Sequence, residues 1–459
     1  MQPSPLVTVY LVNYNYGAYI EQSIESVLIQ DFDDYELLII DDGSTDNSME
    51  IINKYRKNKN VHIIEQKNKG LNTTNNIALK LSSGKYIIRL DADDYLTEDA
   101  LRKMANILED NQNLVMVFPD YFEIDKDNQV IGQVQRHDFD NEVTLFDQPA
   151  HGACTMIKKE ILLEVGGYDE SFNRQDGYDL WLKILHGNYK FKNINKPLFY
   201  YRDHGNNLTK DEKLLLETRS KIIEKHVNKY KNKIKTIALI PVRGPKLDPR
   251  SNPLENLGSK PLINWTIDSV LNSKLIDEII VSTPDNSVIN HIEKYYSGKV
   301  VLHERNERLA RINKNISPTL LDALDFYESN HNVPDAIMVL NIESPFRSSV
   351  YIDKAINVMR LFNVDSVIGV TIEDDIFYTH DGNGLVPYTK IDGLKLERDI
   401  LYRKVGGMSL VSRKYFKNTN KIFGGRIGHI QLDKQSAFMI NSLYDWKLSN
   451  FLSQKEEGV

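Results

Sequence analysis

The chain has 459 residues, more than one ordinary domain holds, and its length predicts two domains of about 200 residues each. Hydrophobic residues make up 41% of the sequence, enough for packed cores, and the formal net charge of -7 gives no support to nucleic-acid binding. A single cysteine, Cys154, excludes an intramolecular disulfide and favours a reducing compartment.

The sequence has none of the usual signals for export or membrane insertion. The N-terminus lacks a basic segment followed by an apolar one, and no uncharged apolar run reaches about 18 residues. We therefore expect a cytoplasmic protein without a signal peptide or a spanning helix. Peripheral contact with the inner face of the cell membrane stays open, because such contact needs no spanning segment.

The first two predicted strands each end in polar residues. Val7 to Val12 is apolar and runs into Asn13 and Tyr14, and a helix is expected next. Leu37 to Ile40 runs in the same way into Asp41-Asp42-Gly43. Strand, polar loop and helix in repetition are typical of a parallel α/β sheet. Ligands bind such sheets at the carboxyl ends of the strands, where these polar loops are expected to lie.

The third predicted strand ends in clustered carboxylates. Tyr86 to Ile88 leads through Arg89 and Leu90 to Asp91, Asp93 and Asp94. An isolated Asp-x-Asp is more often an exposed acidic turn. Here the acids follow a buried strand, so their mutual repulsion needs an opposing charge. Mg²⁺ or Mn²⁺ is the simplest candidate, because both accept oxygen ligands and often keep substrate phosphates in their coordination shell.

Four segments together resemble the signature of family-2 glycosyltransferases with the GT-A fold. They are, in order, VTVYLVNYNYGAYIEQSIESVLIQ, LLIIDDGSTDNS, NKGLNTTNNIALKLSSGKYIIRLDADD and GGYDESFNRQDGYDLWLKIL. The resemblance covers residues 5 to 205 and implies inverting transfer of a sugar from a nucleotide-sugar donor, assisted by Mn²⁺ or Mg²⁺. A UDP-, GDP-, dTDP- or CMP-sugar could serve as the donor.

The resemblance also implies roles for individual residues on the donor side. Asp41 and Asp42 match positions that contact the base and ribose, and Asn13 and Tyr14 belong to the same nucleotide pocket. Asp91 and Asp93 match the metal motif: Asp93 ligates the ion, and Asp91 holds the ribose or the waters of the metal. Arg202 and His204 match a loop that closes over the diphosphate, with His204 also a candidate metal ligand.

The same resemblance places the base of the reaction at Asp176. An inverting transfer needs a base opposite the leaving group, and Asp176 can take the acceptor hydroxyl proton. We expect Asp179 to be structural. Two departures from the family occur: an arginine common between positions 72 and 76 is missing, and Asp176-Gly177 stands where many relatives have Glu-Asp.

The second half of the chain has a resemblance of its own. TIALIPVRGPKLDPRSNPLENLGSKPLINWTIDSVLNS, DEIIVSTPDNSVI, IMVLNIESPFRSSVYIDKAINVM and LYRKVGGMSLVSRKYF resemble, in order, cytidylyltransferases of the CMP-sialic acid synthetase type. The resemblance covers residues 235 to 452 and implies a first loop that cradles the triphosphate of CTP. The residues that could do so here are Arg243, Lys246, Arg250 and Asn252. Residues 381 to 393 resemble an arm that such enzymes exchange across a two-fold axis, which predicts a homodimer.

The catalytic residues of this second family are altered. Pro245 stands in a shortened glycine-rich loop and removes a backbone donor. The Asp-x-Asp pair expected before the last helix falls on Met439 and Asn441, and a thioether is a poor Mg²⁺ ligand. We therefore expect this domain to be degenerate.

The predicted fold is α/β, with two consecutive Rossmann-like domains of the nucleotide-diphospho-sugar-transferase type: a GT-A domain at 1–205, a helical linker at 206–234 and a cytidylyltransferase-like domain at 235–459. The predicted function is sugar transfer to a glycan, lipid-linked or protein acceptor in surface polysaccharide or glycoconjugate biosynthesis. One alternative is a bifunctional enzyme that also makes a CMP-activated acid sugar from CTP. A further alternative is a non-catalytic assembly module.

Overall fold

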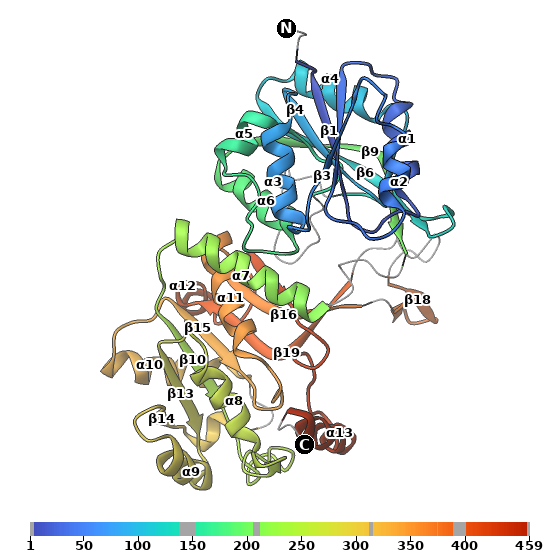
Figure 1. The fold of residues 1–459 in the computed structure, drawn as a ribbon. Helices are drawn as coiled ribbons and strands as arrows, with labels where there is room; N and C mark the ends of the chain where they lie inside the picture. The colour runs from blue at the N-terminus through green and yellow to red at the C-terminus, as the bar shows by residue number, and fades with distance from the viewer. Residues whose placement is uncertain are drawn as a thin grey trace. The chain divides into compact units, whose positions relative to one another are not determined.

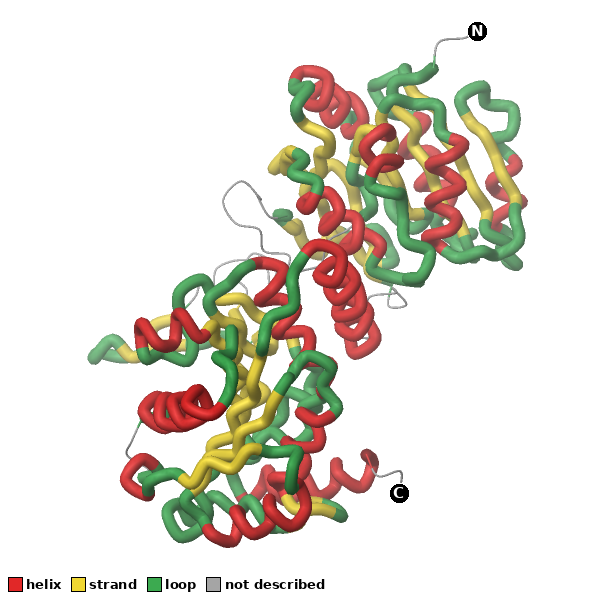
Figure 2. The backbone as a smooth tube through the Cα atoms, turned by 90° about the vertical axis from the view of Figure 1, so that its left-hand side faces the viewer, coloured by secondary structure: helices red, strands yellow, loops and turns green. Residues whose placement is uncertain are grey.

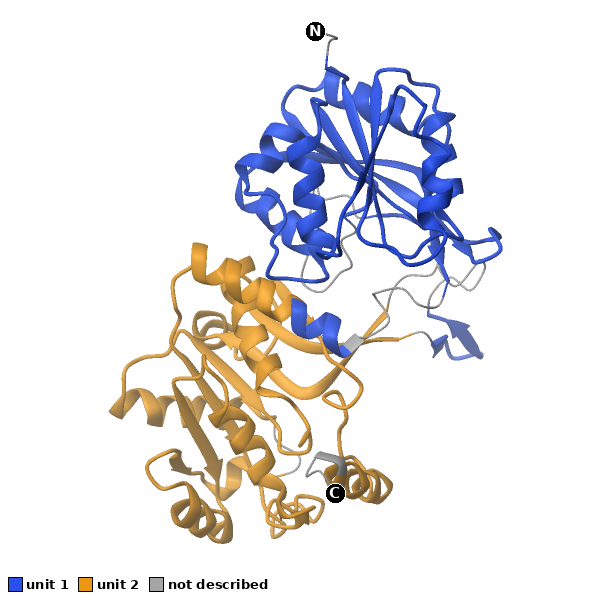
Figure 3. Ribbon diagram, viewed as in Figure 1, with its two compact units in different colours: residues 1–218, 375–399 blue, residues 219–374, 400–459 orange. Residues whose placement is uncertain are grey.

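A computed structural model describes residues 4–136, 152–204, 212–311, 315–373, 375–388 and 401–456. The chain forms two units, which Figure 3 colours separately. Unit 1 comprises residues 1–218 and 375–399, and unit 2 comprises residues 219–374 and 400–459. Both are α/β: a central sheet is flanked by helices in each (Figure 1, Figure 2). Of the expected linker, residues 206–211 lie outside the described residues.

Unit 1 contains strands β1 to β9 and helices α1 to α6. The strands are Val7–Asn13 (β1), Tyr35–Asp41 (β2), Val61–Glu65 (β3), Tyr86–Asp91 (β4), Tyr95–Leu96 (β5), Leu114–Asp125 (β6), Val130–Val134 (β7), Met156–Lys158 (β8) and Lys190–Asp203 (β9). The helices are Ile20–Leu28 (α1), Ser48–Asn53 (α2), Leu71–Leu81 (α3), Ala100–Asp110 (α4), Lys159–Glu164 (α5) and Asp176–His186 (α6).

The sheet of unit 1 has the order β3-β2-β1-β4-β8-β6-β9-β5, with β7 paired to β6. Strands β3, β2, β1 and β4 are parallel neighbours. The register pairs Asn13 with Asp41 and Val12 with Asp91. The polar ends of β1, β2 and β4 therefore lie side by side at one edge, as the sequence predicts for a parallel sheet.

Both faces of this sheet are covered, which explains why β1 and β2 are largely apolar along their length. Val9 and Leu11 of β1 pack on one face against Ile20 and Ile24 of α1. The intervening Tyr10 is also buried, and its hydroxyl donates to that of Tyr168 at 3.0 Å. In Figure 1, α1 and α2 flank one side of the sheet, and α3 and α6 the other.

Helix α7, Glu212–Tyr230, spans the boundary between the units, and the other main elements of unit 2 follow it. The strands are Thr236–Pro241 (β10), Asn256–Leu257 (β11), Lys260–Pro261 (β12), Glu278–Thr283 (β13), Val301–Glu304 (β14), Ala336–Leu340 (β15), Ser366–Glu373 (β16), Leu401–Ser412 (β19) and Ile427–Gln431 (β20). The helices are Leu262–Leu271 (α8), Asn286–Tyr296 (α9), Ser317–Asn330 (α10), Ser349–Phe362 (α11), Arg413–Thr419 (α12) and Leu443–Glu456 (α13), with a 3₁₀ turn at Glu307–Leu309 (η1).

The main sheet of unit 2 has the order β14-β13-β10-β15-β19-β16-β20. Strands β14, β13, β10 and β15 are parallel, and β19 runs antiparallel to both of its neighbours. Leu320 and Leu324 of α10 belong to the same buried core as Ile237 and Leu239 of β10. Helix α11 packs against β16 and β20. This is the second α/β domain that the sequence predicts.

A hairpin lies in the segment 375–399, which groups with unit 1. Its strands are Tyr378–His380 (β17) and Leu385–Pro387 (β18), paired antiparallel. Its apolar side chains are exposed: Leu385 is 70% accessible and Tyr388 is 65% accessible. Of the predicted arm at 381–393, residues 389–393 lie outside the described residues. Across the described ranges, no helix has the length and apolar character to cross a membrane.

Candidate active site

The end of β2 is held by hydrogen bonds from its own turn and from Asn13 at the end of β1. Asn13 Nδ2 donates to Asp41 Oδ2 at 2.7 Å and to Ser44 Oγ at 3.0 Å. The backbone N–H groups of Gly43 and Ser44 donate to Asp41 Oδ1 at 3.1 Å and 2.8 Å. The buried Asp41 carboxylate therefore organises the turn that borders the predicted nucleotide pocket.

The Asp42 carboxylate organises a second loop, which leads into α3, by accepting hydrogen bonds from it. Its carboxylate accepts hydrogen bonds from Gln66 Nε2 at 2.8 Å and from the backbone N–H groups of Lys69 and Gly70, both at 2.9 Å. Gly70 precedes α3, so Asp42 fixes the start of that helix at the site. Tyr14, in contrast, is 47% accessible and is the exposed member of the predicted nucleotide pocket.

The carboxylates after β4 are crowded and buried. Burial raises the pKa of Asp91 to about 6, and the nearby charge of Asp93 adds to this while Arg89 opposes it. Burial also raises the pKa of Asp93. Burial and the charges of both neighbours hold the pKa of Asp94 well above its usual range. Asp94 Oδ2 has no hydrogen-bond partner among the described residues. Ionising these carboxyls therefore costs free energy, and a cation bound beside them would offset that cost.

Two residues at the end of β9 support this cluster. His204 Nε2 lies 3.1 Å from Asp93 Oδ2, and its ring stacks on Tyr19 at a centroid distance of 5.8 Å. Arg202 is only 1% accessible: its Nε donates to the Asp93 backbone carbonyl at 2.9 Å and its Nη2 to Gln22 Oε1 at 2.8 Å. Arg202 therefore holds the acidic loop from inside the protein.

The side chains of this cluster fit a divalent cation that takes some of its ligands from the protein and the others from a bound substrate. Within the described residues, no three His, Cys, Asp or Glu side chains are grouped so as to hold a metal ion alone. Asp93 and His204 form a pair, with one carboxylate and one imidazole. A cation bound there would complete its shell with substrate phosphate and water oxygens, as Mg²⁺ sites built on one or two carboxylates do.

Asp176 is joined to the acidic strand end by Arg89. Asp176 is the first residue of α6 and is 8% accessible, and Arg89 of β4 is 5% accessible. Arg89 Nη1 donates to Asp176 Oδ2, and Arg89 Nε lies 2.8 Å from Asp91 Oδ1. The second contact is an ion pair rather than an aligned hydrogen bond. One guanidinium thus bridges the predicted base and the predicted metal motif.

Sequence reasoning missed the role of Arg89, although a signal was present. A charged residue interrupts the otherwise apolar run Tyr86 to Leu90, and such a residue needs a partner once it is buried. Asp179 is the residue of α6 that we expect to be structural. It is buried, and its Oδ2 lies 2.7 Å from Lys183 Nζ, one turn along α6.

Unit 2 contains a cleft of about 490 Å³ at the predicted nucleotide site. Arg243, Arg250 and Asn252 line it, together with Met439 and Asn441. The altered metal positions and three of the four predicted nucleotide-binding residues therefore line the same space. Lys246 lies outside this lining: its side chain is 80% accessible and pairs with Glu307 at 3.1 Å.

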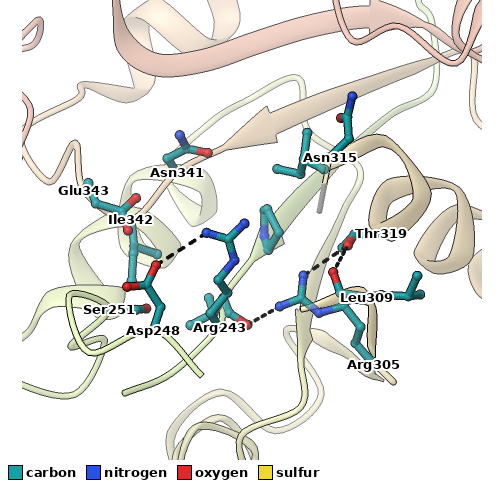
Figure 4. A pocket seen from close by; sticks show the side chains of 13 residues that line it. Arg243, Asp248, Ser251, Arg305, Leu309, Asn315, Thr319, Asn341, Ile342 and Glu343 are labelled. Carbon is teal, nitrogen blue, oxygen red and sulfur yellow. Dashed lines mark hydrogen bonds and ion pairs between the residues drawn. The ribbon is translucent and has the colours of Figure 1, made fainter. Parts of the chain in front are cut away.

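A second cavity of about 140 Å³ shares Arg243 with the cleft and extends toward Arg305. Figure 4 shows Arg243 directed toward Asp248, and the ion pair measures 3.5 Å. Arg305 Nη2 donates to the Val242 carbonyl at 2.7 Å, and burial lowers the pKa of Arg305 to about 10. Glu343 lines both spaces, and burial raises its pKa while Arg243 opposes this. Sequence reasoning identified neither Arg305 nor Glu343.

Comparisons with known proteins match both units. The model of Glycosyl transferase family 2 matches residues 8–166, and that of Cytidylyltransferase matches residues 250–404. The chondroitin synthase of Escherichia coli is 32% identical over 204 residues, covering 44% of this chain and 30% of that protein. The chain thus spans less than a third of that synthase.

Two relatives are covered over most of their length. An uncharacterized glycosyltransferase of Methanocaldococcus jannaschii is 30% identical over 206 residues, covering 43% of this chain and 71% of that protein. WfaP of Escherichia coli, a UDP-Glc:α-D-GlcNAc-diphosphoundecaprenol β-1,3-glucosyltransferase, is 28% identical over 229 residues, covering 48% of this chain and 86% of that protein. The chain therefore belongs to glycosyl transferase family 2, with a cytidylyltransferase domain as its second part.

Proposed function

We propose that unit 1 is an inverting, metal-dependent glycosyltransferase that moves a sugar from a nucleotide-sugar donor to a glycan, lipid-linked or protein acceptor. The observation that carries this proposal is the joining of Asp176 to the acidic end of β4 through Arg89. That end lies at the edge where parallel sheets bind ligands. The similarity to a chondroitin synthase and to WfaP supports a role in surface polysaccharide or glycoconjugate biosynthesis.

The chemistry proposed for Asp176 is that of a general base. The oxygen of the acceptor hydroxyl attacks the anomeric carbon of the donor sugar, and the bond from that carbon to the donor phosphate breaks. Asp176 takes the hydroxyl proton, and the nucleotide leaves with the electron pair of the broken bond. Attack on the face opposite the leaving group inverts the configuration of the sugar.

The acidic loop is proposed to receive the donor diphosphate. Asp93 and His204, with Asp91 beside them, would hold Mn²⁺ or Mg²⁺, which neutralises charge on the leaving group when bound. Arg202 would act through the backbone carbonyl of Asp93, because its guanidinium is buried against the loop. The turns organised by Asp41 and Asp42, with Asn13 and the exposed Tyr14, would border the nucleotide.

We propose that unit 2 binds a nucleotide or an acid sugar without activating it. Met439 and Asn441 line the cleft beside Arg243, and neither can supply a carboxylate to a metal ion. The bifunctional alternative has one observation in its favour: Asp248 and Glu343 line the same cleft and could serve as relocated ligands.

The exposed apolar hairpin supports a proposal of self-association. A two-stranded hairpin is marginally stable in water by itself, and Leu385 and Tyr388 are left accessible. Packing of β17 and β18 against a second copy of the chain would cover them, which fits the predicted homodimer.

The test of the main proposal is nucleotide release by the full-length protein from UDP-, GDP-, dTDP- and CMP-sugars, with and without Mn²⁺. We expect release from one nucleotide class, dependence on the metal, and loss of activity with EDTA. Anomeric analysis of the product by NMR should show inversion. Release that continues unchanged in EDTA would end the metal-dependent proposal, and retention of configuration would end the inverting one.

A further inference from the structure

Arg89 is a buried cation within an apolar strand. It lies between Ile88 and Leu90 of β4, both buried, and its own side chain is 5% accessible. Burying a guanidinium costs free energy unless it is paired and hydrogen-bonded. Replacement of a buried ion pair by packed apolar residues is often neutral for stability. Stability alone therefore does not require a charge at this position.

Arg89 has two carboxylate partners, which lie far from each other in the sequence. Asp91 is two residues away on β4, whereas Asp176 is 87 residues away on α6. Arg89 Nε lies 2.8 Å from Asp91 Oδ1, Arg89 Nη2 lies 3.4 Å from Asp91 Oδ2, and Arg89 Nη1 donates to Asp176 Oδ2. Because the guanidinium is a rigid planar fork, it fixes the orientation of one carboxylate relative to the other.

Gly152 restricts the same carboxylate from another direction. A Cβ atom at this position would lie 2.8 Å from Asp176 Oδ2 and 3.4 Å from Arg89 Nη2. The backbone at residue 152 therefore packs directly against the ion pair. Asp176 is confined between this backbone and the guanidinium, and little room is left for another orientation.

We propose that Arg89 is a positioning residue for sugar transfer, holding the Asp176 carboxylate in a fixed place relative to the strand end that carries Asp91. This inference rests on the proposed role of Asp176 as the base. Arg89 itself touches no reacting atom. It acts by keeping the base in line with a donor bound at the acidic loop, so that each turnover begins from an aligned arrangement.

A double-mutant cycle of R89M and D176N in the full-length protein tests this proposal. The readout is kcat and donor KM for nucleotide release, with Mn²⁺ and the best donor from the sugar-nucleotide panel. We expect R89M to lower kcat by about 10²-fold through misplacement of the base, and D176N to lower it by about 10²-fold. Because both losses act through Asp176, the double variant should stay within about threefold of D176N in kcat.

Two further variants keep the test decisive. R89K retains a charge without the fork and should recover part of the kcat lost in R89M, and it replaces R89M in the cycle if that variant does not fold. K183M removes the neighbouring ion pair with Asp179 on α6 and serves as the matched control. Its effect on kcat should be the same with and without D176N.

The outcomes separate this inference from the proposed function. An equal loss of kcat from R89M in the wild-type and D176N backgrounds would overturn the positioning role while leaving Asp176 as the base. Wild-type kcat in D176N would overturn the assignment of the base, and the positioning role with it. If R89M lowers Tm and raises the donor KM but leaves kcat unchanged, the proposal would also be overturned.

Discussion

Replacing Asp93 by Asn should separate metal binding from folding, because its two effects have opposite signs. Asp93 faces His204 at 3.1 Å, and its charge contributes to the raised pKa values of Asp91 and Asp94. Removing that charge relieves repulsion within the cluster. We therefore expect the metal-free variant to unfold at a temperature no lower than that of the wild type, while its affinity for Mn²⁺ falls.

The size of the affinity loss follows from the lost charge. Mn²⁺ carries two charges, so its attraction to a carboxylate charge about 4 Å away is about 2 kcal/mol at the dielectric constant of water and about 8 kcal/mol at an effective value of about 20. Relief of repulsion among the remaining carboxylates offsets part of this energy. We expect Mn²⁺ to bind Asp93→Asn about 10²-fold more weakly than the wild type.

Thermal unfolding of the full-length protein with and without Mn²⁺ measures both effects. At a concentration of about 100 times Kd, Mn²⁺ should stabilise unit 1 of the wild type by about 2.7 kcal/mol and raise its Tm by about 5–11 °C. Asp93→Asn should lose most of this increase. Asp110, exposed at the end of α4, provides the control, since Asp110→Asn should keep the full increase. An undiminished Mn²⁺ response in Asp93→Asn would refute the reasoning.

Three further predictions concern the base, the second cleft and the hairpin. Asp176→Asn should lower turnover by about 10² or more with little change in donor affinity; weaker nucleotide binding at unchanged turnover would make Asp176 a binding residue, with Asp179 next in line as base. The protein should release no pyrophosphate from CTP with sialic-type or octulosonic acid sugars, and Met439→Asp with Asn441→Asp should restore release; release by the wild type would favour the bifunctional enzyme. Leu385→Asp should weaken self-association by about tenfold or more in analytical ultracentrifugation, because a buried leucine contributes about 1.5–3 kcal/mol; a wild-type monomer would contradict the dimer.

The ends of the parallel strands could be predicted because each is a local feature of the sequence. β1 and β2 are largely apolar runs that stop at polar residues, as is typical of strands covered on both faces, and β4 follows the same pattern apart from Arg89. Parallel pairing in register then brings those ends to one edge, whatever the details of the helices. The two-domain α/β fold and the grouping of the polar loops followed from these rules.

The contacts across that edge could not be predicted in the same way. The bridge from Arg89 to Asp176 depends on where α6 packs against the sheet, which no local pattern specifies. Arg243 and Lys246 are both basic and stand three residues apart in the same loop, yet only Arg243 lines the cleft. The hairpin of β17 and β18 groups with unit 1 although the segments that flank 375–399 belong to unit 2, a grouping that the order of residues does not specify.

The end of β9 has a practical consequence for dissecting this protein. The backbone N–H of Arg202 donates to Asp94 Oδ1 at 3.0 Å, its side chain holds the carbonyl of Asp93, and His204 faces the Asp93 carboxylate. Arg202 and His204, at the end of β9, thus support the acidic loop and form a brace for it. A fragment cut a few residues early, before Arg202, would keep every strand up to β8 intact and still lose the brace. An excised unit 1 should therefore extend at least through His204.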